Sequence, residues 1–129
     1  MNWILIASGF LGFSAVALGA YGDHGLRGTI DEATMHSFET ALRYQLFHAI
    51  ALLAVGIGLT KVLNTTTHKK LFWAGIVMLT GTVVFSSSIY ASVLLGIKSI
   101  TMLTPFGGIT LMVSWLIVGW TGLAQKTEI

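Results

Sequence analysis

Residues 71–97 read LFWAGIVMLTGTVVFSSSIYASVLLGI, without a single Asp, Glu, Lys or Arg. A helix needs about 20 apolar residues to cross the hydrocarbon core of a bilayer, which is about 30 Å thick. This run is long enough to do so. Three further runs, residues 3–21, 44–60 and 99–125, also lack charged side chains. Together the four runs predict a polytopic membrane protein.

The composition agrees with a membrane location. Of the 129 residues, 54% are hydrophobic and only 9% are charged. A soluble domain carries roughly a quarter charged residues, so this chain has too little polar surface to keep a monomer in water. Its length allows one integral membrane domain, residues 1–129, without a separate soluble module. We therefore expect a multi-pass protein of the cell membrane, in contact with the lipid bilayer.

Several classes of function are disfavoured by the residues present. The seven Lys and Arg residues are scattered rather than clustered, so we expect no nucleic-acid partner. Cysteine is absent, and His24, His36 and His48 lack the HxxxH or HExxH spacing that places metal ligands on one helix face. The segment Ser86-Ser87-Ser88 lacks the GxSxG turn of a catalytic serine. We expect no metal, no cofactor and no enzymatic activity.

The runs predict four transmembrane helices packed as an all-α four-helix bundle. The second run, residues 44–60, is short by itself. It reaches spanning length if it extends backward through Leu42 and Ala41, with Arg43 paired or reaching the membrane surface. Ala15-Val-Ala17 resembles a signal-peptidase site, but no basic region precedes this run, so we expect it to be retained as a helix. The predicted helices cover residues of about 3–22, 41–60, 71–95 and 104–124.

The connection between the first two helices, residues 23–40, is polar. Thr29 or Asp31 is suited to be the N-cap of a helix, and Glu32 would then lie in its first turn. We therefore expect a short amphipathic helix over residues 31–38, which lies at the membrane surface and runs into the second transmembrane helix.

The distribution of Lys and Arg predicts the orientation in the membrane. With four spans, both termini and the connection over residues 61–70 lie on one side. That side carries four of the basic residues and the other side three: Lys61, Lys69, Lys70 and Lys126 against Arg27, Arg43 and Lys98. Cytoplasmic loops hold the excess of Lys and Arg, so we expect both termini in the cytoplasm. The small margin leaves dual topology open.

One polar segment, Glu39-Thr-Ala-Leu-Arg43-Tyr-Gln-Leu-Phe-His48, leads directly into the second run. Lipid tails offer no hydrogen-bond partner, so polar groups there need partners within the protein. Glu39 and Arg43 are four residues apart, in the order that favours an ion pair. Tyr44 and Gln45 share a helix face with His48. We expect Arg43, Gln45 and His48 to face protein, with His48 touching the first or fourth helix.

Polar residues of the other helices would meet this segment on the side of the membrane that faces the first connection. His24 ends the first helix there, and Tyr90, Lys98 and Thr104 lie towards the same side. Two interpretations stay open: a polar vestibule that binds an ion, proton or small polar ligand, or hydrogen bonds that fix the helix register. The candidate site comprises His24, Glu39, Arg43, Tyr44, Gln45, His48, Tyr90 and Thr104.

Small residues recur every four positions on three of the predicted helices. Such spacing lets helix backbones approach closely in a membrane, where no hydrophobic force drives association. We expect these faces to pack helices together, and the protein to form a homo-oligomer or to join another membrane protein. The residues are Ala15 and Gly19, Ala54 and Gly58, and Ser88, Ser92 and Gly96.

Three stretches resemble the signatures of a known family. Gly19-Ala-Tyr-Gly-Asp-His24-Gly25-Leu26 is similar to Gly-Ala-Phe-Gly-Ala-His-Gly-Leu, and Thr40-Ala41, Tyr44-Gln45 and His48-Ala49 to a Thr-Ala…Tyr-Gln…His-Ala pattern. Phe85-Ser86 with Tyr90, and the segment 103–108, resemble Phe-Ser…Tyr and Thr-Pro-Leu-Gly-Gly patterns. The set resembles the domain of unknown function 423 family of small bacterial membrane proteins, related to the eukaryotic transmembrane protein 256. The resemblance implies a small polytopic membrane protein and no particular reaction.

Three functions stay open at this point. The first is a non-enzymatic protein that binds or passes a small solute or ion at a polar vestibule around Arg43 and His48. The second is a structural or regulatory subunit that packs against another membrane protein, which the short connections and small-residue faces would suit. The third and least favoured is a lipid- or quinone-directed membrane enzyme, with His24 and His48 as acid–base groups.

Overall fold

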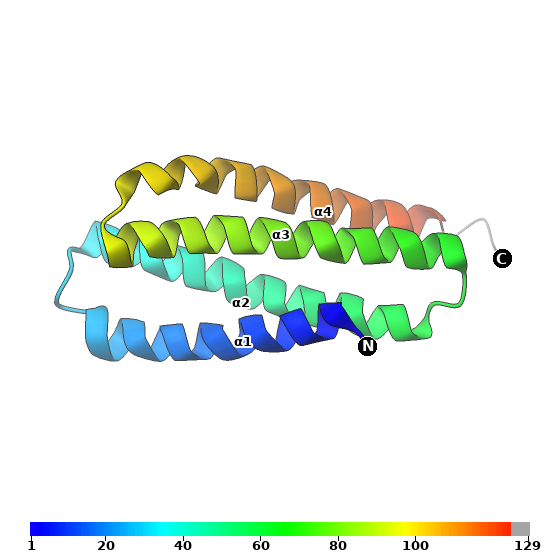
Figure 1. Ribbon diagram of the computed structural model, residues 1–129, viewed down its shortest axis with the longest axis horizontal. Coiled ribbons are helices and arrows are strands. Elements are labelled where there is room, and N and C mark those ends of the chain that lie inside the picture. Colours follow the sequence, from blue (N-terminus) through cyan, green and yellow to red (C-terminus); the bar gives the residue numbers. More distant parts are fainter. Residues whose placement is uncertain (125–129) are drawn as a thin grey trace.

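The apolar runs form four long α-helices in the computed structural model, which describes residues 1–124 (Figure 1). They are α1 (Trp3–Tyr21), α2 (Glu32–Lys61), α3 (Thr65–Leu95) and α4 (Thr104–Ala124). A π-helical turn, η1 (Gly22–Leu26), continues α1, and a 3-10 helix, η2 (Lys98–Leu103), precedes α4. With these extensions, all four helices are long and apolar enough to cross a membrane. The predicted all-α four-helix architecture is confirmed.

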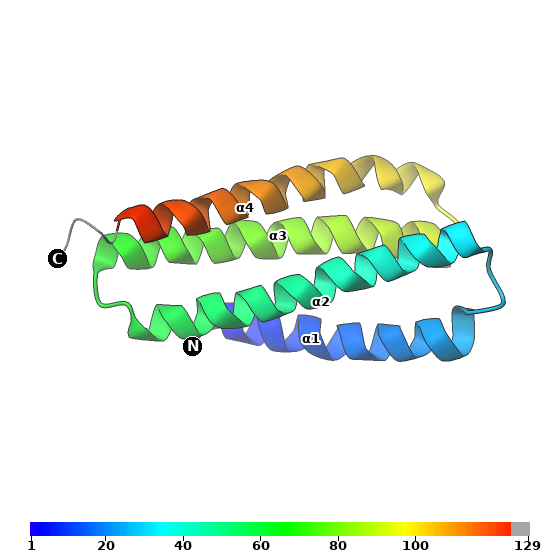
Figure 2. The ribbon, with the colours of Figure 1, turned by 180° about the vertical axis from the view of Figure 1, so that it is seen from behind.

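The helices run antiparallel and lie side by side in chain order. α1 packs on α2, α2 on α3 and α3 on α4, so that α2 and α3 occupy the middle of the bundle (Figures 1 and 2). α1 begins and α4 ends near the α2–α3 connection, and we call this the terminal end of the bundle. η1, the start of α2 and η2 lie at the opposite end, the loop end (Figure 1).

Residues 32–38, which were expected to form a separate helix at the membrane surface, belong to α2. Asp31 is the N-cap of α2: its Oδ1 accepts the Thr34 backbone N–H at 2.9 Å and its Oδ2 the Thr34 hydroxyl at 2.7 Å. The bonds from Thr34 hold the pKa of Asp31 below its ordinary value. Because no proline interrupts residues 32–61, α2 continues over about 45 Å at 1.5 Å per residue. The helix expected over residues 31–38 is therefore the first turns of α2.

The third helix begins earlier than the predicted residue 71. The Asn64 side chain caps it at its first turn by accepting the Thr67 backbone N–H at 3.0 Å. The lysines of the connection are consequently helical. Lys70 lies with its Nζ 4.4 Å from the centroid of the Trp120 ring, which makes a cation–π contact between α3 and α4 at the terminal end.

Two apolar clusters fill the space between the helices. The larger contains side chains from all four helices and is centred on the fully buried Leu52 and Met78. The smaller lies at the loop end, where Phe38 is fully buried beside Leu26 and Met35. Many large apolar side chains on α1 and α4 remain exposed, as expected for helices that face lipid tails.

The backbones of α3 and α4 approach closely at two glycines. A Cβ added at Gly107 would lie 2.5 Å from the Phe85 backbone nitrogen, and one at Gly81 would lie 2.9 Å from the Leu111 nitrogen. Backbone atoms cannot move aside as the end of a flexible side chain can. The α3–α4 crossing therefore requires glycine at both positions, in the manner of small-residue packing in membranes.

The small residues singled out on the first two helices have unequal roles. Ala15 is buried. An added Cβ at Gly19 would meet a Leu42 side-chain carbon at 3.4 Å, across the α1–α2 contact. Gly58 is half-buried and faces α3, but Ala54 is exposed. Ala54 lies on the outer side of α2 and packs against no helix of the described chain, so a packing face through Ala54 stays a prediction that concerns a second protein.

The small residues of the third helix also have unequal roles. Ser88 is buried, and its hydroxyl lies 2.6 Å from the hydroxyl of Thr104 at the start of α4. Ser92 is half-buried, and Gly96 is exposed. Gly96 ends α3 in the left-handed conformation, with φ of 70°, which glycine adopts without a steric penalty. Gly96 therefore ends α3, and a packing role for it with a second protein stays a prediction. The homo-oligomer stays a prediction.

The positions of the two ends lead to a test of topology. We expect Leu63→Cys, at a position that is 96% exposed at the terminal end, and Glu32→Cys at the loop end to react with an impermeant maleimide from opposite faces of the membrane. The two ends of α2 are about 45 Å apart, and no native cysteine competes. If the termini are cytoplasmic, only Glu32→Cys should react in intact cells.

Reaction of both positions from one face alone would contradict four spans. Equal reaction of both positions from both faces would instead indicate dual insertion. The cytoplasmic assignment rests on a narrow margin of basic residues, of which Lys126 lies outside the described residues.

Candidate functional site

Gln45 anchors the polar segment of α2 and is only 3% exposed. Its Nε2 donates to the Leu11 carbonyl oxygen at 2.9 Å and to the Ser14 hydroxyl at 2.8 Å, both on α1. Its Oε1 accepts the Tyr90 hydroxyl of α3 at 2.7 Å. One side chain thus joins three helices, with both amide protons used. We call Gln45, Ser14 and Tyr90 the Gln45 cluster.

Other interior hydroxyls also bridge neighbouring helices. The Ser8 hydroxyl of α1 donates to the Ala49 carbonyl at 2.9 Å, and the Ser86 hydroxyl of α3 donates to the Ala41 carbonyl at 2.8 Å. Among residues 1–124, no buried side-chain nitrogen or oxygen lacks a hydrogen-bond partner. Some buried hydroxyls, such as those of Thr82 and Ser114, bond a carbonyl of their own helix. Gln45, Ser8 and Ser86 instead link neighbouring helices, which is a common role of polar groups in membranes.

His48 is held between its own helix and α4. Its Nδ1 lies 2.7 Å from the Tyr44 carbonyl oxygen, and its Nε2 lies 3.1 Å from the Trp115 indole nitrogen. An indole N–H can only donate, so Nε2 is the acceptor and Nδ1 carries the proton, an assignment that follows from the bonding pattern. Both ring nitrogens are occupied in this arrangement. His48 contacts the fourth helix as predicted, and it has no nitrogen free for a metal or a second proton.

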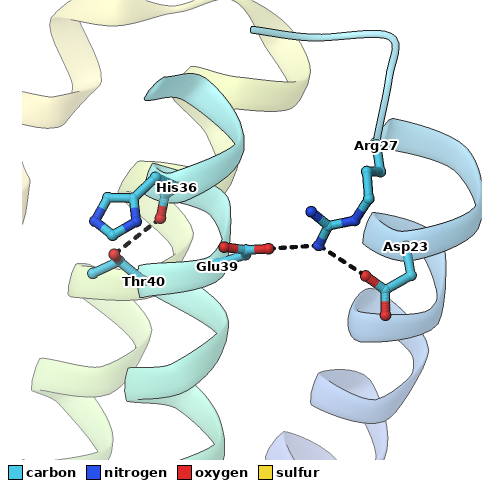
Figure 3. Close-up of polar contacts among 5 residues, drawn as sticks. All are labelled: Asp23, Arg27, His36, Glu39 and Thr40. Atoms are coloured by element: carbon cyan, nitrogen blue, oxygen red, sulfur yellow. Dashed lines mark hydrogen bonds and ion pairs between the residues drawn. The ribbon is translucent and has the colours of Figure 1, made fainter. Parts of the chain in front are cut away.

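The predicted ion pair between Glu39 and Arg43 is wrong. Glu39 Oε1 instead lies 2.6 Å from Arg27 Nη2, and the same nitrogen lies 3.0 Å from Asp23 Oδ1 (Figure 3). Arg27 thereby ties the end of the first span to α2. The hydrogen bond to Glu39, followed by the one to Asp23, raises the pKa of the Arg27 guanidinium. Helical spacing favours a pair between Glu39 and Arg43, but the connection between α1 and α2 places Arg27 beside the Glu39 carboxylate instead.

Arg43 lies at the surface and not against protein, contrary to expectation. Within the described part of the chain it has neither an ion pair nor a hydrogen bond from its side chain. It lines a groove of about 280 Å³ between α2 and α4, together with Tyr44, Phe47, His48 and Trp115. We call this hollow the Arg43 groove.

A second hollow, of about 400 Å³, opens at the loop end. Its walls come from α2, α3, η2 and the first residue of α4, and we call it the loop-end vestibule. His36 and Thr40 lie on the side of α2 that is turned away from Arg27 (Figure 3). The polar residues of its wall include His36, Ser37, Thr40, Ser92, Lys98 and Thr104.

The predicted site residues are therefore divided among separate places. Gln45 and Tyr90 meet in the Gln45 cluster, and Thr104 reaches the loop-end vestibule. His24 is exposed on η1 and lines neither hollow. The predicted residues do not converge at one polar site. The Arg27 bridge, which is the pair of contacts from Arg27 to Asp23 and Glu39, joins η1 to α2 on the side of α2 that is turned away from the vestibule.

Sequence reasoning missed Trp115 and Ser14 as partners of the polar segment. A signal for Trp115 existed, because an indole N–H in the middle of an apolar helix needs an acceptor. The hydroxyl of Ser14 carried no such signal, since a serine in a helix commonly bonds a carbonyl of its own helix. The vestibule combines residues from four separate elements, and their proximity has no signature in local sequence.

Residues 18–108 match the model of a family described as a protein of unknown function, DUF423. The chain belongs to this family. The matched range contains Gln45, Tyr90 and every residue of the loop-end vestibule.

Relatives of the DUF423 protein cover nearly its whole length. UPF0382 membrane protein SAB0533 of Staphylococcus aureus is 35% identical over 118 residues, which are 92% of this chain and 93% of that protein. UPF0382 inner membrane protein YgdD of Escherichia coli is 32% identical over 127 residues, 97% of this chain and 94% of that protein. No solved structure matches the chain. These names and the four apolar helices establish an integral membrane protein, while the relation to the eukaryotic transmembrane protein 256 stays a prediction.

The Gln45 cluster leads to a stability prediction. Gln45→Leu should lower the free energy of unfolding in detergent by about 1–3 kcal/mol, because it removes three cross-helix hydrogen bonds and leaves the Tyr90 hydroxyl without its acceptor. Thr110→Val is the control, since that hydroxyl bonds the Phe106 carbonyl of its own helix. Equal losses in the two variants would show that the cluster does not hold the helices together.

The bond between His48 and Trp115 can be measured by a double-mutant cycle. His48→Leu and Trp115→Phe each remove one partner, and we expect a coupling free energy of about 0.5–2 kcal/mol between them. His48→Gln should keep most of the stability, because its amide oxygen can accept the indole N–H. Additive losses in the cycle would contradict the bond.

Proposed function

We propose that this DUF423 protein is a non-catalytic membrane protein that binds a small anionic solute in the loop-end vestibule. The observation that supports the proposal most directly is a hollow of about 400 Å³ into which free polar groups project from three different elements. Hollows of this size are typical of small-ligand sites in other proteins.

The free polar groups are the His36 ring on α2, the Ser92 hydroxyl on α3 and the Lys98 ammonium on η2. Within residues 1–124, none of these side chains has a hydrogen bond or an ion pair. None of the described residues that line the vestibule carries a carboxylate. One fixed positive charge beside free donors favours a phosphate or carboxylate group.

The location favours binding over passage across the membrane. The vestibule lies at the loop end, where the first turns of α2 extend beyond its apolar run. Nearer the middle of the bundle, the Gln45 cluster and the Ser86 hydroxyl are engaged with neighbouring helices. A solute that reached the vestibule from water would find no unpaired buried polar side chain among residues 1–124 to lead it further.

The alternatives have less support. A structural or regulatory subunit is suggested only by the exposed apolar faces of α1 and α4, and lipid tails would cover those faces equally well. A membrane enzyme with His24 and His48 as acid–base groups is disfavoured, because His24 is exposed and does not line the groove that contains His48, and both nitrogens of His48 are engaged. The names of the relatives indicate no enzymatic activity.

Lys98→Met tests the proposal with inorganic phosphate as the probe. We expect it to weaken phosphate binding, measured by calorimetry in a neutral detergent, by about tenfold, the effect of losing one charge-assisted hydrogen bond. Lys69→Met is the matched control, since it removes the same charge at the terminal end. Equal affinities of both variants and the unaltered protein would contradict a binding site at Lys98.

The class of solute can be tested separately from the site. Glycerol, a neutral polyol, should bind far more weakly than phosphate, and equally tight binding would overturn the anionic assignment. Untargeted metabolite profiling of a deletion strain, complemented with the unaltered protein or with Lys98→Met, would then identify the natural solute. The expected result is a solute whose level changes in the deletion strain, is restored by the unaltered protein and is not restored by Lys98→Met.

A further inference from the structure

The position of Arg43 along α2 places it at the depth of lipid headgroups. The segment between Arg43 and Lys61 carries no charge. It spans about 27 Å at 1.5 Å per residue, close to the hydrocarbon thickness of about 30 Å. If Lys61 lies at the membrane boundary of the terminal end, Arg43 lies at the boundary of the loop end.

The fold leaves the charge of Arg43 without a partner. Glu39, which is one helical turn away and in a favourable order for pairing, is bonded to Arg27 instead (Figure 3). No other carboxylate of residues 1–124 pairs with Arg43. A guanidinium at this depth is stabilised by an oxyanion, and lipid phosphates are the oxyanions that lie there.

The wall beside Arg43 is aromatic. Phe47 and Trp115 face each other across α2 and α4, with ring centroids 6.3 Å apart. Both nitrogens of His48 are already engaged, so this ring offers the groove no free polar nitrogen. The groove thus places a free cation next to an apolar surface. This arrangement complements a lipid, which carries an anionic phosphate next to an apolar acyl chain.

We propose that the Arg43 groove binds one anionic phospholipid. The Arg43 guanidinium holds the phosphate through its paired N–H donors, and the first methylenes of an acyl chain lie against Phe47 and Trp115. The site is independent of the loop-end vestibule, because the two hollows share no lining residue. Either one can therefore fail its test without affecting the other.

Native mass spectrometry of the delipidated full-length protein, titrated with dioleoyl phosphatidylglycerol, tests this site. Arg43→Gln should weaken the binding of the first lipid by about tenfold, because a charge-assisted hydrogen bond to phosphate is lost. Arg43→Lys should lie in between, since it keeps the charge but not the paired donors. Lys61→Gln, which removes one charge at the opposite boundary and lies outside the groove, should change the affinity less than about twofold. Unchanged thermal stability would show that the variants fold.

Three outcomes would overturn the proposal. The first is equal lipid affinity of Arg43→Gln and Lys61→Gln, which would show that attraction is not specific to the groove. The second is binding of glycerol phosphate, which has no acyl chain, as tightly as the lipid, which would show a site for free phosphate. The third is a photo-crosslinker at Phe47 that captures a polypeptide and no lipid in membranes, which would show that a partner protein occupies the groove.

Discussion

A polar group inside a bilayer must find its hydrogen-bond partner within the protein, and Gln45 satisfies this constraint for three helices at once. Its amide nitrogen reaches two oxygens of α1, and its amide oxygen receives the Tyr90 hydroxyl of α3. The donors and the acceptor of an amide point in fixed, different directions within one plane. This pattern of bonds therefore specifies how each of the three helices is rotated about its own axis. The apolar contacts around it do not specify rotation as strictly, because lipid tails are as apolar as the side chains they replace.

The same constraint determines where function can be located. Gln45, His48, Ser8 and Ser86 have found partners in neighbouring helices, and no buried side-chain nitrogen or oxygen of residues 1–124 lacks a partner. The candidate sites are therefore hollows at the surface of the bundle. Each of the two contains a free charge, Lys98 in the loop-end vestibule and Arg43 in the Arg43 groove, and both lie at or near the loop end. The Arg27 bridge contributes to the second, because it takes the carboxylate that Arg43 would otherwise use.

Some site residues were predictable from local spacing and some were not. The shared face of Tyr44, Gln45 and His48 follows from helical periodicity, and His48 does contact the fourth helix. The partner of Glu39 did not follow, because Arg27 approaches through a connection whose path no local pattern specifies. The small residues gave a similar mixture. The spacing at Ser88 marked a true contact with α4, but Gly96 in the same series ends the helix. The close approach of α3 and α4 at Gly107 lay outside the series.

The sequence by itself determined the solvent, the number of membrane helices and the DUF423 family. These are local properties, since an uncharged apolar run of sufficient length indicates a membrane-spanning helix without reference to the rest of the chain. Only the tertiary structure decided which polar groups meet, that Arg43 is left free and that a vestibule forms at the loop end. The physical reason is that these helices are apolar over most of their circumference, so hydropathy does not mark the side that faces the neighbouring helix. Hydrogen bonds between helices and close packing at glycines supply that information, and they exist only once the helices have come together.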